Sequence, residues 1–146
     1  SGPFPTELND EIGERLRQEG SEFGTTTGRA RRCGWLDIPA LRLAIEVNGI
    51  SRMALNKLDI LSGFPILRIA IAYFSKTTFH DTLARFEHSQ PIYEDLPGWE
   101  EPIRGLCQWD KLPKNAQHYV ERIQELLGVP IDFVGTGPNR QEGIQL

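Results

Sequence analysis

The sequence predicts a mixed α/β fold, of the α/β or α+β class, from two strong periodic patterns and from the loose alternation of helical and strand-like segments. A helix is expected over residues 114–127, where apolar residues recur at i, i+3 and i+4 and Gly128 follows as a stop. A strand is expected over residues 66–74, where Ile, Leu and Tyr dominate and only Arg68 interrupts the apolar run.

Two further helices are expected in the first third of the chain. Residues 7–18 place apolar side chains four apart with charges between them, which is typical of one buried stripe. A second helix should begin after Asp37, a suitable N-cap, with Pro39 in its first turn, and should run through Asn48 with Gly49 just past its end. One face of that helix should collect Leu41, Ala44, Ile45 and Asn48.

The remaining segments are shorter and less regular. Residues 53–55 and 129–134 are expected as strands, and residues 142–146 as a last extended segment. Residues 91–99 contain two prolines and a glycine, which predicts a turn-rich connection. Residues 76–90 give no clear pattern, so their structure and role stay open.

Composition and charge argue against several classes of protein. A chain of 146 residues with 39% hydrophobic and 25% charged residues suits one soluble globular domain. Its net charge of -4 gives no general electrostatic reason to bind nucleic acid or membrane, so we expect neither partner. Cys33 and Cys107 lack CxxC spacing and the histidines show no ligand pattern, so we expect no zinc site and a cytoplasmic location.

The first candidate for a binding site is the loop of residues 25–32, Thr-Thr-Thr-Gly-Arg-Ala-Arg-Arg, which is rich in hydroxyl and guanidinium groups. Its threonine hydroxyls, a glycine and three guanidinium groups suit a small dianion, because guanidinium groups bind carboxylate or phosphate oxygens in pairs. The alternative is a solvated basic loop whose arginines pair with neighbouring carboxylates. The spacing alone does not choose between the two.

A second candidate is the tetrapeptide Asn56-Lys57-Leu58-Asp59 at the end of an expected strand. An ionised Asp59 carboxylate offers two acceptors to the two adjacent N–H donors of guanine, which adenine lacks, while the Lys57 stem can lie along the ring. The alternative is an accidental tetrapeptide in a turn.

A third candidate is the turn Gly135-Thr136-Gly137, where two glycines let the backbone approach a flat ligand and Thr136 adds a hydroxyl. A plain turn is the alternative. The sequence contains no Gly-x-x-x-x-Gly-Lys-Ser/Thr loop, so nothing in it predicts a triphosphate cradle of the P-loop kind.

Taken in order, these segments resemble the adenylosuccinate synthetase family over essentially the whole chain. The resemblance is carried by residues 2–7 (GPFPTE), 22–37 (EFGTTTGRARRCGWLD), 56–59 (NKLD), 93–99 (YEDLPGW) and 136–138 (TGP) with Arg140. The chain departs from the family pattern at Ala30, where a larger residue is usual, and at Gly135, where we expect a small hydroxyl residue.

The resemblance implies a portion of the family fold with a mixed sheet and flanking helices, and it implies a role for each candidate residue. The aspartate-binding loop would consist of Thr25, Thr26, Thr27, Gly28, Arg29, Ala30 and Arg31. Arg29 would also bind IMP, and Arg31 would reach the GTP side. The guanine-binding residues would be Lys57, Leu58, Asp59, Gly135, Thr136 and Gly137.

The reaction implied is the GTP-dependent ligation of IMP and L-aspartate to adenylosuccinate, a step of AMP and purine biosynthesis. The catalytic residues and the Mg²⁺ ligands are expected in an N-terminal portion, so we assign no catalytic or metal-binding residue to this chain. The sequence starts Ser-Gly-Pro without methionine, from which we expect a C-terminal fragment of a homodimeric enzyme that is inactive without the remainder.

Two other functions remain possible at this stage. The first is a stand-alone guanine-nucleotide-binding regulatory module, which would bind GTP tightly without further sequence. The second is a binder of anions or nucleic acid through Arg29, Arg31 and Arg32, whose affinity would fall steeply with salt. The acidic overall charge argues against the second.

Overall fold

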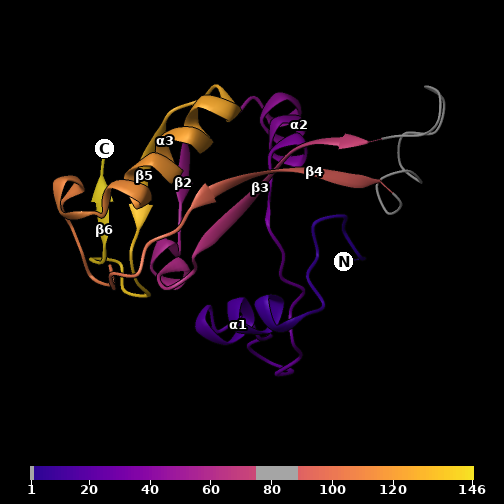
Figure 1. The fold of residues 1–146 in the computed structure, drawn as a ribbon, viewed down its shortest axis with the longest axis horizontal. Coiled ribbons are helices and arrows are strands. Elements are labelled where there is room, and N and C mark those ends of the chain that lie inside the picture. Colours follow the sequence, from indigo (N-terminus) through magenta and orange to yellow (C-terminus); the bar gives the residue numbers. More distant parts are fainter. Residues whose placement is uncertain (1, 75–88) are drawn as a thin grey trace. The chain divides into compact units, whose positions relative to one another are not determined.

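The computed structural model describes residues 2–74 and 89–146 and contains helices and strands in a mixed α/β arrangement, as the sequence predicts (Figure 1). The α-helices within these ranges are α1 (Glu11–Glu19), α2 (Ile38–Asn48) and α3 (Lys114–Leu127). The strands are β1 (Leu36–Asp37), β2 (Met53–Leu55), β3 (Ile66–Phe74), β4 (Gln90–Pro97), β5 (Ile131–Gly135) and β6 (Gly143–Gln145). Short 3₁₀ helices cover Leu58–Leu61 (η1) and Trp109–Lys111 (η3).

The chain divides into two compact units. The first unit comprises Ser1–Pro39 and Arg68–Glu94, and the second comprises Ala40–Leu67 and Asp95–Leu146. The expectation of a single domain stays a prediction, and each unit is described by itself.

The first unit contains α1 and most of a three-stranded sheet of order β1-β3-β4. β1 pairs with β3 in parallel, with Leu36 opposite Ile69. The structure starts α1 at Glu11 rather than at residue 7, because the side chain of Asp10 caps the helix by accepting from the Gly13 amide at 3.0 Å. Glu7 instead forms an antiparallel bridge with Gly34.

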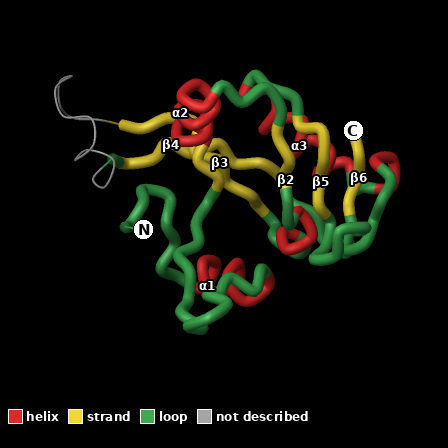
Figure 2. Tube along the Cα trace, turned by 180° about the vertical axis from the view of Figure 1, so that it is seen from behind, coloured by secondary structure: helices red, strands yellow, loops and turns green. Residues whose placement is uncertain are grey.

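The second unit is built on a sheet of order β2-β5-β6 (Figure 2). β2 runs parallel to β5 with Leu55 opposite Val134, and β6 runs antiparallel to β5 with Ile144 opposite Val134. α3 adds an apolar stripe to this unit, and that stripe is buried as the periodicity predicts. The buried residues of α3 are Ala116, Gln117, Tyr119, Val120, Ile123 and Leu127.

One expectation is wrong and others need adjusted bounds. Residues 91–99 were expected as a turn-rich connection, but Gln90–Pro97 forms the strand β4 at the edge of its sheet. Pro91 and Pro97 lie near the two ends of this strand, where a missing N–H is tolerated best. β5 begins and ends later than the expected 129–134. Most of the unassigned segment, residues 75–88, lies outside the described residues.

α2 begins directly after Asp37 and ends before Gly49, as predicted. Leu41, Ala44 and Ile45 are half-buried, which confirms the expected face, but the side chain of Asn48 is exposed. None of the described helices is long and apolar enough to cross a membrane.

Candidate functional site

The loop of residues 25–32 closes a small hairpin in the first unit. Phe23 and Ala30 form an antiparallel bridge at its base, and the Arg31 amide donates to the Glu22 carbonyl at 2.9 Å. Nearer the tip, the Gly28 amide donates to the Gly24 carbonyl at 2.8 Å. Gly28 has a φ of +63°, a left-handed conformation that glycine adopts without steric cost. The segment is therefore a loop, as predicted, with a hydrogen-bonded backbone.

The side chains of this loop differ in how they are engaged. All residues from Thr25 to Arg32 are exposed. The guanidinium of Arg31 pairs with Glu22 at 3.0 Å and that of Arg32 pairs with Glu7 at 2.9 Å. Among the described residues, the guanidinium of Arg29 has no hydrogen-bond or ion-pair partner. Arg31 and Arg32 therefore pair with neighbouring carboxylates, as the alternative interpretation of the loop expects. The guanidinium of Arg29 remains available to an anionic ligand.

Helix α1 supports the loop through a residue that the sequence did not single out. The Nε of Arg17 donates to the Arg31 carbonyl at 2.9 Å, and its other guanidinium nitrogen pairs with Glu14 on the same helix. The Glu22 amide in turn donates to the Arg17 carbonyl at 2.9 Å. The only sequence signal for this role is a basic residue in the last turn of the helix before the loop.

In the second unit, the parallel pairing of β2 and β5 brings the other two candidate segments to one edge of the sheet. Chain segments that follow neighbouring parallel strands leave the sheet at the same edge. Asn56–Asp59 therefore lies beside the turn that begins at Gly135. A Cβ added at Gly135 would lie 2.8 Å from Oδ1 and 3.3 Å from Cα of Asn56, so the two segments meet only because position 135 has no side chain.

The turn after β2 presents a carboxylate with an unused acceptor. Lys57 adopts a left-handed conformation with a φ of 61°, after which Leu58 is buried at 1% exposure in η1 and anchors the turn. Oδ1 of Asp59 is shielded from solvent and has no hydrogen-bond partner among the described residues. A buried carboxylate oxygen without a donor is costly, so this atom is suited to accept from a ligand.

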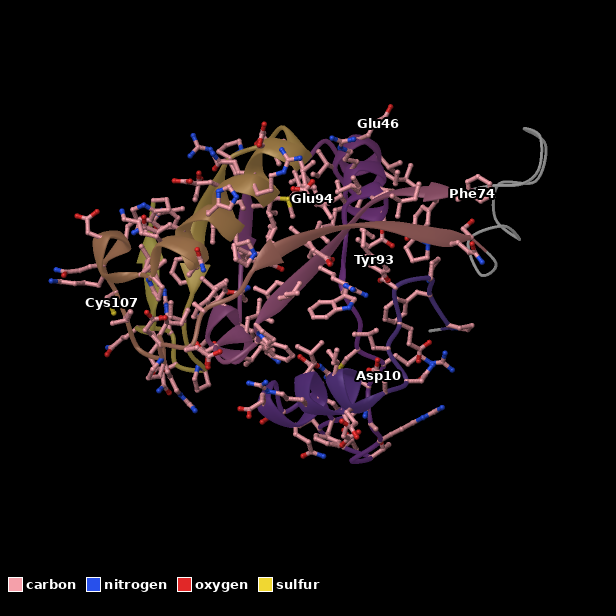
Figure 3. All side chains as sticks on the ribbon, in the orientation of Figure 1. Asp10, Glu46, Phe74, Tyr93, Glu94 and Cys107 are labelled. Carbon is pink, nitrogen blue, oxygen red and sulfur yellow. The ribbon has the colours of Figure 1, made fainter. Side chains whose placement is uncertain are left out.

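Thr136 is engaged differently from the expectation. Its side chain is 0% exposed, and its hydroxyl donates to the Leu106 carbonyl at 2.7 Å, while the Gly105 amide donates to the Thr136 carbonyl at 3.0 Å. The hydroxyl that the sequence offered to a ligand thus joins the turn to residues 105–107. Cys107, labelled in Figure 3, adds to this join by donating its thiol to the Gln141 carbonyl at 3.3 Å.

The structure thus groups the candidate residues into two sets. Lys57, Leu58 and Asp59 lie together with the turn of residues 135–137 in the second unit. The loop of residues 25–32 belongs to the first unit. Within the described ranges, no group of three or more His, Cys, Asp or Glu side chains is arranged to hold a metal ion.

Comparisons with known proteins agree with the resemblance seen in the sequence. The family described as adenylosuccinate synthetase matches residues 1–144. An adenylosuccinate synthetase of Trichlorobacter lovleyi is 48% identical over 100% of this chain, which covers 35% of that protein. The enzyme of Thermobifida fusca is 51% identical, again over 100% of this chain and 35% of its own length.

A solved structure gives the same result. The structure of fully ligated adenylosuccinate synthetase from Plasmodium falciparum matches with a TM-score of 0.91 and 40% identity. The match covers 100% of this chain and 36% of that one. The chain therefore spans about a third of the length of the curated relatives and of the solved structure that it matches.

Proposed function

We propose a function that proceeds from family membership: this chain belongs to the adenylosuccinate synthetase family, and it supplies contacts to guanine nucleotide, aspartate and IMP for the GTP-dependent formation of adenylosuccinate. The observation that carries the proposal is the unpartnered, buried Oδ1 of Asp59, at the edge where Asn56–Asp59 meets the turn of residues 135–137.

Guanine recognition follows from the donors of the base. Guanine presents two adjacent N–H donors, which one carboxylate accepts together, whereas adenine presents an acceptor at the corresponding ring nitrogen. The aliphatic stem of Lys57 and the backbone of Gly137 supply surfaces on which a flat ring can lie, and the buried Gly135 lets Asn56 pack closely beneath them. Leu58 contributes by anchoring the turn that carries Asp59.

The loop supports the aspartate and IMP part of the proposal. The unpaired guanidinium of Arg29 and the exposed hydroxyls of Thr25, Thr26 and Thr27 surround the hairpin tip, where Gly28 and Ala30 leave the backbone accessible. A dicarboxylate or an anionic nucleotide can bind there through charge-assisted hydrogen bonds. Arg31 would reach the GTP side after it exchanges Glu22 for a phosphate oxygen.

The proposal gives this chain binding and positioning roles. The family reaction uses Mg²⁺, but the described residues offer no cluster that fits such an ion, so we derive no step through it. No catalytic residue is assigned among these residues. Assembly as a homodimer with the rest of the enzyme, and a cytoplasmic location, stay predictions.

The test uses the 146-residue chain itself. Titrations with GDP, ADP and xanthosine diphosphate, followed by amide chemical shifts, should give weak binding that favours GDP over ADP. In Asp59→Asn an amide N–H₂ replaces one acceptor, so the preference for GDP should be lost. Affinity for the xanthine nucleotide should rise, because xanthine carries an oxygen where guanine carries the amino group.

Three results would count against the proposal. Equal affinity for GDP and ADP in the unmodified chain would remove the base-reading role, and so would an unchanged preference in Asp59→Asn. Tight binding of GTP by this chain would instead favour a stand-alone guanine-nucleotide-binding regulatory module.

A further inference from the structure

Glu142, at the C-terminal end of the turn between β5 and β6, contacts that turn through both its backbone and its side chain. Its Oε2 accepts from the Asn139 amide at 2.8 Å, and its own amide donates to the Asn139 carbonyl at 2.9 Å. Its carbonyl accepts from the Thr136 amide at 3.0 Å. One residue therefore binds the beginning and the end of the turn between β5 and β6.

The same carboxylate fills the space beside Gly137. A Cβ added at Gly137 would lie 2.7 Å from Cδ of Glu142, which is closer than real Cβ atoms come to their neighbours, and 3.0 Å from its Cβ, which is a tight contact. The Glu142 side chain, which is half-buried, therefore lies directly against the Gly137 backbone. The absence of a side chain at position 137 makes this contact possible.

The turn is fixed on its other side as well. The hydrogen bonds of Thr136 to Leu106 and Gly105 hold it to residues 105–107, and Gly135 lies against Asn56. The backbone of residues 135–137 is therefore held from both sides next to the segment that carries Asp59. The Glu142 carboxylate contacts this turn at Gly137 and at the Asn139 amide.

We infer that Glu142 is a positioning residue for guanine recognition: its carboxylate accepts from the Asn139 amide and lies against Gly137, and so holds Gly137 beside the segment that carries Asp59. The inference rests on the proposed function and goes beyond it, because no ligand contact is assigned to Glu142 itself. Removing the carboxylate leaves the backbone hydrogen bonds of residue 142 to Thr136 and Asn139 in place but should loosen residues 137–139, and a mobile turn lowers affinity for the ligand that needs it ordered.

The experiment compares three substitutions in the 146-residue chain. Glu142→Ala removes the acceptor, so GDP affinity should fall roughly tenfold, while ADP affinity should change less than about twofold. Glu142→Gln keeps an amide oxygen that can accept from Asn139, so it should stay within about threefold of the unmodified chain. Glu121→Ala, at an exposed glutamate of α3, is the matched control and should change neither affinity.

A second readout reports on the turn without any nucleotide. Hydrogen exchange at the Asn139 amide should accelerate roughly tenfold in Glu142→Ala and stay close to normal in Glu142→Gln. Gly137→Ala should reproduce the Glu142→Ala result, because the added methyl group displaces the carboxylate without removing it. Amides of α3 serve as the check that each variant is folded.

The outcomes separate the inference from the function beneath it. If Asp59→Asn loses the preference for GDP but Glu142→Ala keeps full GDP affinity, the positioning role is overturned and the proposed function stands. An equal loss of GDP and ADP affinity in Glu142→Ala, or normal exchange at Asn139, also overturns it. If the unmodified chain shows no guanine preference, both fail together.

Discussion

Gly135 sets the distance between the two segments of the expected base site. A methyl group at this position would press on Oδ1 and Cα of Asn56, and Cα is backbone that cannot rotate away.

We therefore expect Gly135→Ala to weaken GDP binding and to lower the free energy of unfolding by about 1–2 kcal/mol, as overpacked sites do. Chemical denaturation and a GDP titration measure the two effects. Asn56→Ala removes the nearer contact, so the double variant should recover part of the stability lost by Gly135→Ala. Strict additivity of the two substitutions would contradict the steric explanation.

Among the loop arginines, Arg29 is the one whose guanidinium has no partner among the described residues, and this distinguishes it from Arg32. Arg29→Leu should reduce the shifts that millimolar L-aspartate causes at the Thr25–Thr27 amides, with a loss of about 1 kcal/mol in binding. Arg32→Leu is the matched control, because its guanidinium pairs with Glu7 and should not be needed. Equal losses in the two variants would mean that the loop acts by net charge alone.

At the scale of elements, α1 and the hairpin loop behave as one structure. The Arg17 guanidinium joins the last turn of α1 to the Arg31 carbonyl, and the Arg17 carbonyl receives the Glu22 amide. Both ends of the loop are thus tied to a helix whose start is fixed by the Asp10 cap, labelled in Figure 3.

This arrangement predicts that Arg17→Ala speeds hydrogen exchange at the Gly24, Gly28 and Arg31 amides by roughly five- to tenfold, which corresponds to about 1 kcal/mol of local stability. Arg122→Ala is a close control, because Arg122 makes the same i,i+3 ion pair on a helix, with Glu125, at 2.6 Å. Unchanged exchange in the loop of Arg17→Ala would show that the hairpin orders itself.

The elements that the sequence predicted best are those whose pattern is complete within the segment. The bounds of α3 and β3 agree with prediction because a full apolar stripe and a run of branched residues need no outside information. The strand β4 was missed because its two prolines are typical of turns, and only its neighbour β3 gives it a partner.

In the candidate site, too, features that lie within one segment could be predicted, whereas features that depend on a distant partner could not. The residue types of the loop and of Asn56–Asp59 suggested their chemistry directly, and the parallel pairing of β2 with β5 then placed two of the segments together. Arg17 acts on a backbone carbonyl 14 positions away, whose location no local pattern reveals. Glu142 acts on an amide only 3 positions away, but its contact with Gly137 depends on how the turn folds. Thr136 looked like a ligand hydroxyl because its partner Leu106 lies 30 residues earlier.

At the scale of the whole molecule, each compact unit carries one set of candidate residues and at least one tyrosine whose pKa is raised by full or partial burial. In the first unit, the Tyr73 hydroxyl donates to Asp37, and burial followed by this hydrogen bond raises the pKa of Tyr73. In the second unit, burial alone raises the pKa of Tyr119, whose ring contacts Trp99 edge-on at a centroid distance of 6.1 Å. Both units should therefore respond to alkaline pH.

The sign of this response follows from proton binding. An unfolded tyrosine has a pKa of about 10, whereas these folded tyrosines have raised pKa values and keep their protons longer. Above pH ~10 the unfolded state binds fewer protons than the folded state, so stability falls with pH. Each tyrosine contributes its full stabilisation at pH values below its pKa in the unfolded state. This stabilisation is lost as the pH rises toward the pKa of the same tyrosine in the folded state.

We expect the free energy of unfolding to fall above pH ~10 by up to about 1.4 kcal/mol per pH unit for the buried Tyr119, and by less for the partly exposed Tyr73, whose charge is screened by water. Tyr119→Phe keeps the aromatic ring against Trp99 and removes the titrating group. Its stability should therefore decline less steeply than that of the unmodified chain in urea denaturation between pH 8 and 11.5. Parallel curves for the two proteins would mean that Tyr119 ionises in the folded state as readily as in the unfolded one, and that its burial does not exclude the charge.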